Sequence, residues 1–315
     1  MNLWDDDATA IENAEEGFLE SSGGKFTKLD SKYGTGIYRS DLEKDRVHII
    51  VNGGGGYGPM WIGFCGAGIA DASVNGYLAA APNAYVLYEM GRAVNRGKGV
   101  LFLTNNYMGD YLNNDLALEL LRHDGIETEA VYITDDVFSS LGESRRERGG
   151  LHGIGQVSKI AMAAAEAGRS LEEVKAICEK ANDRLRSLSI NVRGGKMFFG
   201  EGISGEQAVT EEPFTTVKEM MGSALGKLLE ELADFRNEPV FLSISNNREV
   251  SYTEKYILLH AGMDFLRNKN IRLIGAAAGT YFDNFQGKGA IVSLLSCDSE
   301  LAGFETAVQG YDFVV

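Results

Sequence analysis

The chain has 315 residues, enough for two domains of ordinary size, and 44% of them are hydrophobic, which is sufficient for a folded core. Its 30 basic and 45 acidic residues give a formal net charge of -15, which repels nucleic-acid phosphates and anionic membranes, so neither is expected as a partner. The acidic N-terminus is unlike a signal peptide, no apolar run has the length of a membrane span, and the three cysteines are far apart, so the sequence predicts a cytoplasmic protein.

In the first half of the chain, the sequence pattern predicts strands that alternate with helices. They follow an acidic, partly helical arm at residues 1–17. Short apolar runs with β-branched residues predict the buried strands, at 46–51, 99–104 and 128–133. Helical spacing predicts the helices, at 84–94 and 114–123. The Gly- and Ala-rich stretch 60–80 is expected to be irregular. This order is typical of a parallel sheet, whose ligands bind at the carboxyl ends of the strands.

The second half begins with a helix whose capping box is Ser170 to Glu173. Further helices are predicted at 216–232 and 252–265, and strands at 240–245, 271–275 and 290–296. We place a domain boundary near Leu188, before a stretch at 193–205 that is expected to be irregular. The predicted fold is α/β, with two α/β domains that each have a sheet flanked by helices, at residues 1–188 and 189–315.

A block of glycine follows the first predicted strand, at Gly53, Gly54, Gly55, Gly56 and Gly58. Glycine lets backbone N–H groups approach a ligand without obstruction, so the segment from Asn52 to Pro59 is a candidate for holding ligand oxygen atoms. The alternative is a tight structural turn. Pro59 and the Gly-rich residues 63–68 are poor material for the long helix of a dinucleotide-binding fold, and no Gly-Lys-Ser/Thr follows to make a Walker A loop.

Two further segments combine polar residues with flexibility. Asn105 to Asp110 follows the second predicted strand, where an aspartate can accept a proton from a substrate hydroxyl, although the pattern alone favours a turn or cap residue at Asp110. Gly200 to Glu206 is a flexible loop, and on its own it is better interpreted as a linker. The four histidines are scattered and suggest no metal site. Of these, His152 in a Gly-rich turn is the single candidate for a function.

In their order and spacing, the three segments resemble the substrate-binding subunit of dihydroxyacetone kinases. The shared motifs are three glycines followed by a polar residue and Pro, Asn-Tyr-x-Gly-Asp at 106–110, and Gly-x-Gly-Ile-x-Gly-Glu at 200–206. The resemblance covers about residues 15 to 305. It implies two α/β domains, usually in a homodimer, and phosphorylation of a short ketose together with a separate subunit that holds ATP or ADP with Mg²⁺. No cofactor is then expected on this chain.

The resemblance also assigns roles to residues. Asp110 would be the general base, and substrate oxygens would be held by the glycine loop, Gly53, Gly54 and Gly55. The glycine loop, residues 105–110 and Ser204 are expected to converge on one pocket, because two of these segments end strands and the third is flexible.

The chain departs from the family at three of its functional positions. Ser204 stands where a histidine forms a hemiaminal with the ketone, Tyr57 stands for a second histidine, and Asn105 stands for a lysine. A serine hydroxyl is a weak nucleophile towards ketones without an adjacent base. Covalent capture of the ketose is therefore not expected, although all three residues remain candidates for binding it.

Two classes of function are compatible with the sequence. The first is a kinase subunit that binds a triose, tetrose or related polyol without a covalent bond and uses Asp110 as the base. The second is a catalytically silent paralogue that senses a ligand or binds a regulatory partner. The retained Asp110 and the intact glycine loop favour the first. The natural substrate and the phosphoryl donor, ATP or a phosphocarrier chain, stay open.

Overall fold

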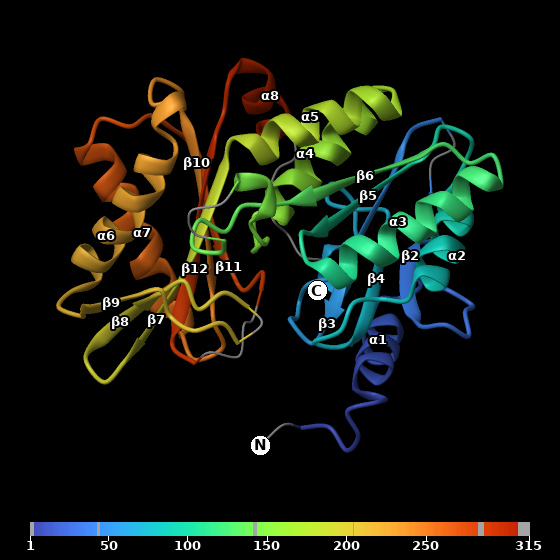
Figure 1. Ribbon diagram of the computed structural model, residues 1–315, viewed down its shortest axis with the longest axis horizontal. Helices are drawn as coiled ribbons and strands as arrows, with labels where there is room; N and C mark the ends of the chain where they lie inside the picture. The colour runs from blue at the N-terminus through green and yellow to red at the C-terminus, as the bar shows by residue number, and fades with distance from the viewer. Residues whose placement is uncertain (1–2, 43–44, 141–143, 204, 283–286, 308–315) are drawn as a thin grey trace. The chain divides into compact units, whose positions relative to one another are not determined.

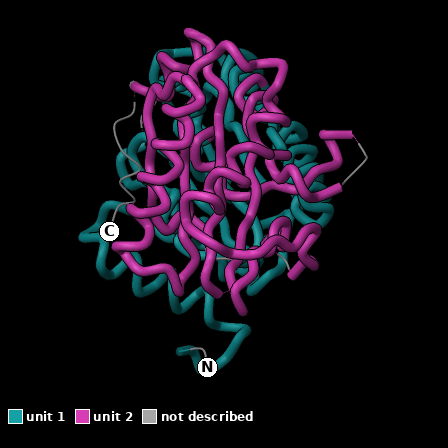
Figure 2. The backbone as a smooth tube through the Cα atoms, turned by 90° about the vertical axis from the view of Figure 1, so that its left-hand side faces the viewer, with its two compact units in different colours: residues 1–132, 158–179, 312–315 teal, residues 133–157, 180–311 magenta. Residues whose placement is uncertain are grey.

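The computed structural model describes residues 3–42, 45–140, 144–203, 205–282 and 287–307. The chain divides into two compact units (Figure 2). Unit 1 holds residues 1–132, 158–179 and 312–315, and unit 2 holds residues 133–157 and 180–311. Two six-stranded sheets with flanking helices form the fold (Figure 1), so the predicted α/β class is confirmed.

The sheet of unit 1 has the strand order β1-β2-β4-β3-β5-β6. Its strands are β1 (Phe26–Lys28), β2 (Thr35–Arg39), β3 (His48–Gly55), β4 (Ala72–Leu78), β5 (Val100–Asn105) and β6 (Thr128–Ile133). β3 is parallel to β4 and β5, whereas β2 is antiparallel to β1 and β4. The parallel pairing of β3 with β5 places their carboxyl ends at one edge, as the sequence predicts.

Helices complete unit 1. They are α1 (Ala10–Ser21), the short 3₁₀ helix η1 (Ile62–Phe64), α2 (Ala84–Val94) and α3 (Met108–His123). α2 and α3 pack into one core with β3 and β5, through residues such as Met90, Leu121 and Phe102. α4 (Ile154–Glu166) and α5 (Leu171–Asp183) contain residues of both units.

Strand β4 corrects the expectation that residues 60–80 are irregular. β4 lies between β3 and β2 and pairs with both. Its small residues allow close approach, since a Cβ at Gly76 would overlap the carbonyl of Ala80. The glycine and alanine content that suggested a loop therefore reflects crowding around a buried strand.

Unit 2 has a mixed sheet with the order β11-β10-β12-β7-β8-β9. Its strands are β7 (Leu185–Arg193), β8 (Lys196–Phe199), β9 (Thr210–Pro213), β10 (Val240–Asn246), β11 (Leu273–Gly279) and β12 (Gly289–Ser296). Its own helices are η2 (Arg145–Glu147), α6 (Val217–Glu231), η3 (Ala233–Phe235), α7 (Tyr252–Asn268) and α8 (Ser299–Ala307). The hairpin of β7 and β8 occupies much of the stretch 193–205 that was expected to be irregular.

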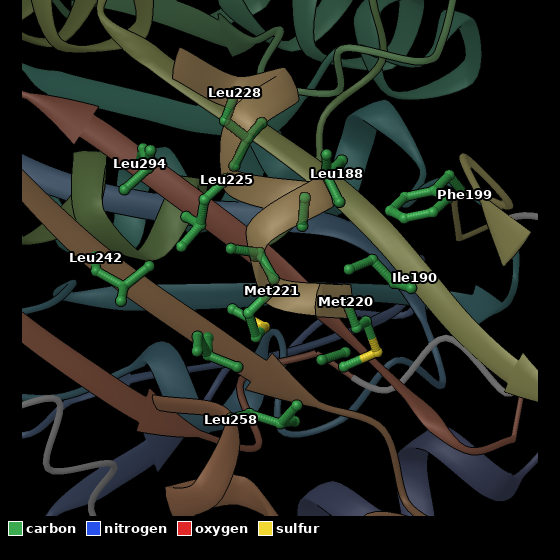
Figure 3. Packing of buried hydrophobic residues seen from close by; sticks show 14 of the residues in the cluster. Leu188, Ile190, Phe199, Met220, Met221, Leu225, Leu228, Leu242, Leu258 and Leu294 are labelled. Carbon is green, nitrogen blue, oxygen red and sulfur yellow. The ribbon is translucent and has the colours of Figure 1, made fainter. Parts of the chain in front are cut away.

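The core of unit 2 lies between one face of this sheet and helices α6 and α7 (Figure 3). Met221 and Leu225 of α6 meet Leu242 and Leu294 of the sheet and Leu258 of α7. Leu188, where the sequence placed a domain boundary, lies inside β7, and that boundary stays a prediction. Within the described residues, no helix has the length and apolar character needed to cross a membrane.

Candidate functional site

The carboxyl end of β3 is held to helix α3 by a pair of asparagines and to β5 by a threonine. Asn52 of β3 and Asn114 of α3 exchange side-chain hydrogen bonds of 3.0 and 2.9 Å between their amide nitrogen and oxygen atoms. Asn114 also donates to the carbonyl of Asp110, one helical turn earlier, at 2.8 Å. Thr104 of β5 donates to the Asn52 carbonyl at 2.8 Å. Asp110 and the start of the glycine block are therefore fixed on the same edge of the sheet.

The glycine block is partly strand and partly turn, because β3 continues to Gly55. A Cβ at Gly53 would overlap the indole of Trp61, and a Cβ at Gly55 would overlap the carbonyl of Gly76. Gly54 is less confined, with Ala80 at 3.4 Å from the position of a Cβ. Glycine is thus required for packing at positions 53 and 55, as the structural interpretation expects, and the binding of a ligand by the block stays a prediction.

Asp110 lies in the first turn of α3 with only 7% of its surface exposed. Its carboxyl oxygen Oδ1 has no hydrogen-bond partner within the described part of the chain. Removal from water raises the pKa of Asp110 from the ordinary 3.8 to about 7. A carboxyl group that titrates near neutrality and keeps a free oxygen is suited to accept a proton from a ligand hydroxyl.

Asn105 ends strand β5 and is 3% exposed. Neither the oxygen nor the nitrogen of its side-chain amide has a hydrogen-bond partner among the residues that the structure describes. Buried amides are normally paired, since an unpaired polar group costs about 1–3 kcal/mol. Asn105 therefore offers one acceptor and two N–H donors close in sequence to Asp110. Tyr57, which follows the glycines, is also buried.

The loop of the third motif belongs to unit 2 and is held by strand β7. Glu201 is buried and accepts hydrogen bonds from Asn191 at 2.8 Å and from Arg193. The backbone N–H of Gly202 donates to the Ser189 hydroxyl at 3.0 Å. Ser204 lies outside the described residues, so its predicted convergence with the glycine loop and Asp110 stays a prediction.

His152 is enclosed in the interior of unit 2. Its ring nitrogens hydrogen-bond to the Ser243 hydroxyl at 2.9 Å and to the Ser293 hydroxyl at 3.2 Å, and its ring stacks on Tyr281. Burial lowers the pKa of His152 to about 3, so the imidazole is neutral at physiological pH. Both ring nitrogens are thus bonded inside the protein, and a function of His152 stays a prediction.

Comparison with known proteins agrees with this arrangement of motifs. The model of the Dak1 domain matches residues 16–309. The chain belongs to the Dak1 domain family. The resemblance to the substrate-binding subunit of dihydroxyacetone kinases is thereby confirmed.

Relatives of this Dak1 chain include both separate subunits and longer kinases. It is 29% identical over 314 residues to the dihydroxyacetone-binding subunit DhaK of the PTS-dependent dihydroxyacetone kinase 2 of Listeria innocua, covering 95% of this chain and 94% of the relative. It is also 29% identical over 309 residues to an L-erythrulose kinase of Pectobacterium atrosepticum, covering 92% of this chain and 52% of the relative. The chain spans about half the length of that kinase.

Solved structures show the same fold. The dihydroxyacetone kinase of C. freundii superposes with a TM-score of 0.87 at 24% identity, over 96% of this chain and 58% of that chain. A structure described under regulation of the dha operon of Lactococcus lactis superposes with a TM-score of 0.88 at 22% identity, over 96% of this chain and 95% of that chain.

The Dak1 chain also contains site residues that the sequence reasoning did not single out. Asn114 supports the site through a bond to Asn52, 62 residues earlier, and Trp61 through a bond to the carbonyl of nearby Gly54. Asn114 carried one detectable signal, because it stands four residues after Asp110 and so on the same side of a helix. Trp61 lay in a stretch that was expected to be irregular and gave no such signal.

Proposed function

We propose that this Dak1 chain binds a short ketose, dihydroxyacetone or a four-carbon homologue such as erythrulose, and presents its hydroxyl group for phosphorylation. The observation that carries the proposal is the buried Asp110 carboxyl group, whose Oδ1 is unpaired in the described structure, at the glycine-lined edge of the sheet. The names of the relatives, which include dihydroxyacetone-binding subunits and erythrulose kinases, support the choice of substrate class.

The proposed chemistry assigns one task to each group. The Asn105 amide donates to the ketose carbonyl or accepts from a hydroxyl, and backbone N–H groups of the glycine loop bind further oxygens. The reacting hydroxyl loses its proton to Asp110 while its oxygen forms a bond to the phosphorus of the donor. The bond between that phosphorus and the donor breaks, and the donor leaves with the electron pair.

Binding is proposed to be non-covalent, because Ser204 stands at the position of the hemiaminal-forming histidine. The sugar would then be held by hydrogen bonds alone, including those of Asn105 and Tyr57. A crystal soaked with dihydroxyacetone is expected to show the ketose separated from every side chain. Continuous density between a ketose carbon and a side chain would contradict this part of the proposal.

A separate subunit is proposed to carry the phosphoryl donor. We expect that subunit to hold ATP or ADP with Mg²⁺, with the phosphate coming from ATP itself or from a phosphocarrier chain. Several relatives are named PTS-dependent kinase subunits, and one is named PEP-dependent, which supports a phosphocarrier as donor. A homodimer and a cytoplasmic location belong to the same proposal.

The test combines the chain with a nucleotide-carrying kinase subunit and a panel of short ketoses. Asp110→Asn is expected to lower kcat by about 10² to 10⁴-fold with little change in ketose affinity, because it removes the base but keeps the shape. In the unmodified chain, kcat/KM should rise with pH through about 7 as Asp110 loses its proton.

Asp115→Asn is the matched control, since Asp115 lies on the same helix and accepts from Tyr132. Turnover should survive that change. Unchanged turnover in Asp110→Asn would remove Asp110 from the mechanism. Ketose binding without phosphoryl transfer, in the presence of any donor subunit, would instead indicate a ligand sensor.

A further inference from the structure

A buried carboxyl group outside the proposed reaction lies on helix α1. Glu15 is fully buried, and its Oε1 accepts a hydrogen bond of 2.7 Å from the Nδ2 of Asn75 in strand β4. Its second oxygen, Oε2, has no hydrogen bond of good geometry within the described residues, although the nearby Thr35 side chain lowers the pKa that burial raises. Lys28, the nearby cation, forms ion pairs with Glu12 and Glu16. Glu15 is thus kept in the interior without a salt bridge among the described residues.

The other end of Asn75 leads to the glycine loop. Its Oδ1 accepts from the backbone N–H of Trp61 at 3.3 Å, while the indole Nε1 of Trp61 donates to the carbonyl of Gly54 at 3.1 Å. The indole also lies so close behind Gly53 that a side-chain carbon there would overlap it. One chain of contacts therefore runs from Glu15 through Asn75 and Trp61 to the loop.

The orientation of the Asn75 amide gives the buried carboxyl group of Glu15 a structural role. An amide can rotate its oxygen and nitrogen, and an acceptor on the α1 side fixes the nitrogen there. The oxygen then faces the Trp61 N–H group. An apolar residue at position 15 would pack as well but would leave the amide nitrogen unpaired, at a cost comparable to a lost hydrogen bond. Helix α1 also reaches the loop directly, because Ile11 lies against Gly55.

We propose that Glu15 and Asn75 are positioning residues, which hold Trp61 as the support behind Gly53 and Gly54. The inference rests on the proposed function in one respect, that the glycine loop binds the ketose. Loss of the support should leave the loop in place but less well ordered, so ketose affinity falls while the catalytic base is untouched.

The test uses the indole N–H of Trp61 as a reporter that needs neither ligand nor partner. The chain has two tryptophans, Trp4 and Trp61, so a Trp4→Phe background leaves one indole signal in a nitrogen-15 spectrum. In that background, Glu15→Ala and Asn75→Ala are expected to shift the signal and speed its exchange with water. Glu15→Gln keeps an acceptor oxygen and should restore the original signal.

Ketose binding is the second readout, measured with dihydroxyacetone by calorimetry. Glu15→Ala and Asn75→Ala should raise Kd about tenfold, which corresponds to the loss of one ordinary hydrogen bond. Val94→Ala, which truncates a buried residue at the far end of α2, lowers the stability of unit 1 without touching this chain of contacts. It should leave both the indole signal and Kd unchanged.

Each outcome separates this inference from the proposed function. An unchanged indole signal in Glu15→Ala, or one that changes equally in Val94→Ala, would overturn the positioning role. A changed signal with no ketose binding by the unmodified chain would refute only the proposed substrate. Should the alanine variants fail to fold, Trp61→Phe removes the last link alone. Unaltered dihydroxyacetone affinity in Trp61→Phe would then overturn the inference.

Discussion

Asp110 keeps its proton up to a pH at which an exposed aspartic acid is ionised. Burial is the main cause, and the raised pKa of about 7 means that the folded chain binds this proton more tightly than the unfolded chain does. The protonated Asp110 side chain therefore makes its full contribution to the unfolding free energy below about pH 4. This contribution is lost as the pH rises through about 7. The whole loss is on the order of 4 kcal/mol.

Asp110→Asn should remove this loss, because an amide is neutral at every pH. The variant is expected to unfold at a higher temperature than the unmodified chain at about pH 8, and to differ little from it at about pH 4. Glu15 and Asp136 also have raised pKa values of about 7. Both residues are present in the variant and in the unmodified protein, so their contributions to the pH dependence of stability cancel in the comparison. A difference that is constant between the two pH values would contradict the raised pKa.

Asn105 gives a second prediction at the level of single residues. Its amide is buried and unpaired in the described structure, so Asn105→Leu should raise the unfolding free energy by about 1–3 kcal/mol and abolish ketose binding. Asn114→Leu is the matched control, because the Asn114 amide is fully engaged with Asn52 and Asp110. It should lower stability by a similar amount. Urea unfolding of the two variants checks the opposite signs, and equal destabilisation would show that Asn105 is paired.

At the scale of elements, strand β3 places neighbouring glycines in different surroundings. A methyl group at Gly53 would overlap Trp61, whereas one at Gly54 would meet Ala80 at an ordinary contact distance of 3.4 Å. Gly53→Ala is therefore expected to cost about 1–3 kcal/mol through overpacking, and Gly54→Ala less than about 1 kcal/mol. Thermal unfolding measures both. Comparable losses would mean that Trp61 moves aside freely.

Strand β3 and its neighbours also show how much of the fold the sequence predicts. The apolar run 46–51 and the glycines after it predicted a strand that ends in a candidate loop, and β3 is such a strand. β4 was not predicted, because its small residues follow from how closely the chain packs around it, which no local pattern contains. Helix α3 begins at Met108, whereas the sequence pattern predicted a start at residue 114. The buried face of its first turns carries the polar residues Asp110 and Asn114, so the apolar residues there do not recur at helical spacing.

For the molecule as a whole, the question is whether the two units unfold together. The chain passes from one unit to the other at residues 132–133, 157–158 and 179–180, and helix α4 contains residues of both. Loss of unit 2 would thus remove the first turn of a helix that unit 1 continues. We expect a single cooperative transition.

Leu225→Ala tests this expectation from within unit 2. Leu225 is fully buried in the core of Figure 3, so its truncation should cost about 2–5 kcal/mol. Both tryptophans lie in unit 1, so their fluorescence reports that unit, while circular dichroism reports the whole chain. The unfolding midpoint measured by fluorescence and the one measured by circular dichroism should fall together. Leu112 is exposed, so Leu112→Ala should change neither midpoint. A fluorescence midpoint that stays in place would show independent unfolding.

Two asparagines that support the glycine loop, Asn52 and Asn75, bear on the chemical degradation of the protein during storage. Asn52 and Asn75 are each followed by glycine, the sequence in which asparagine deamidates most readily, because the next backbone nitrogen can attack the side-chain carbonyl. Here both lie in strands, and their amides are held by Asn114 and by Glu15 with Trp61. That attack requires a side-chain rotation which these bonds oppose. The folded chain should therefore keep both amides during long storage. Deamidation at these two positions would identify molecules in which the hydrogen bonds that hold the glycine loop had broken.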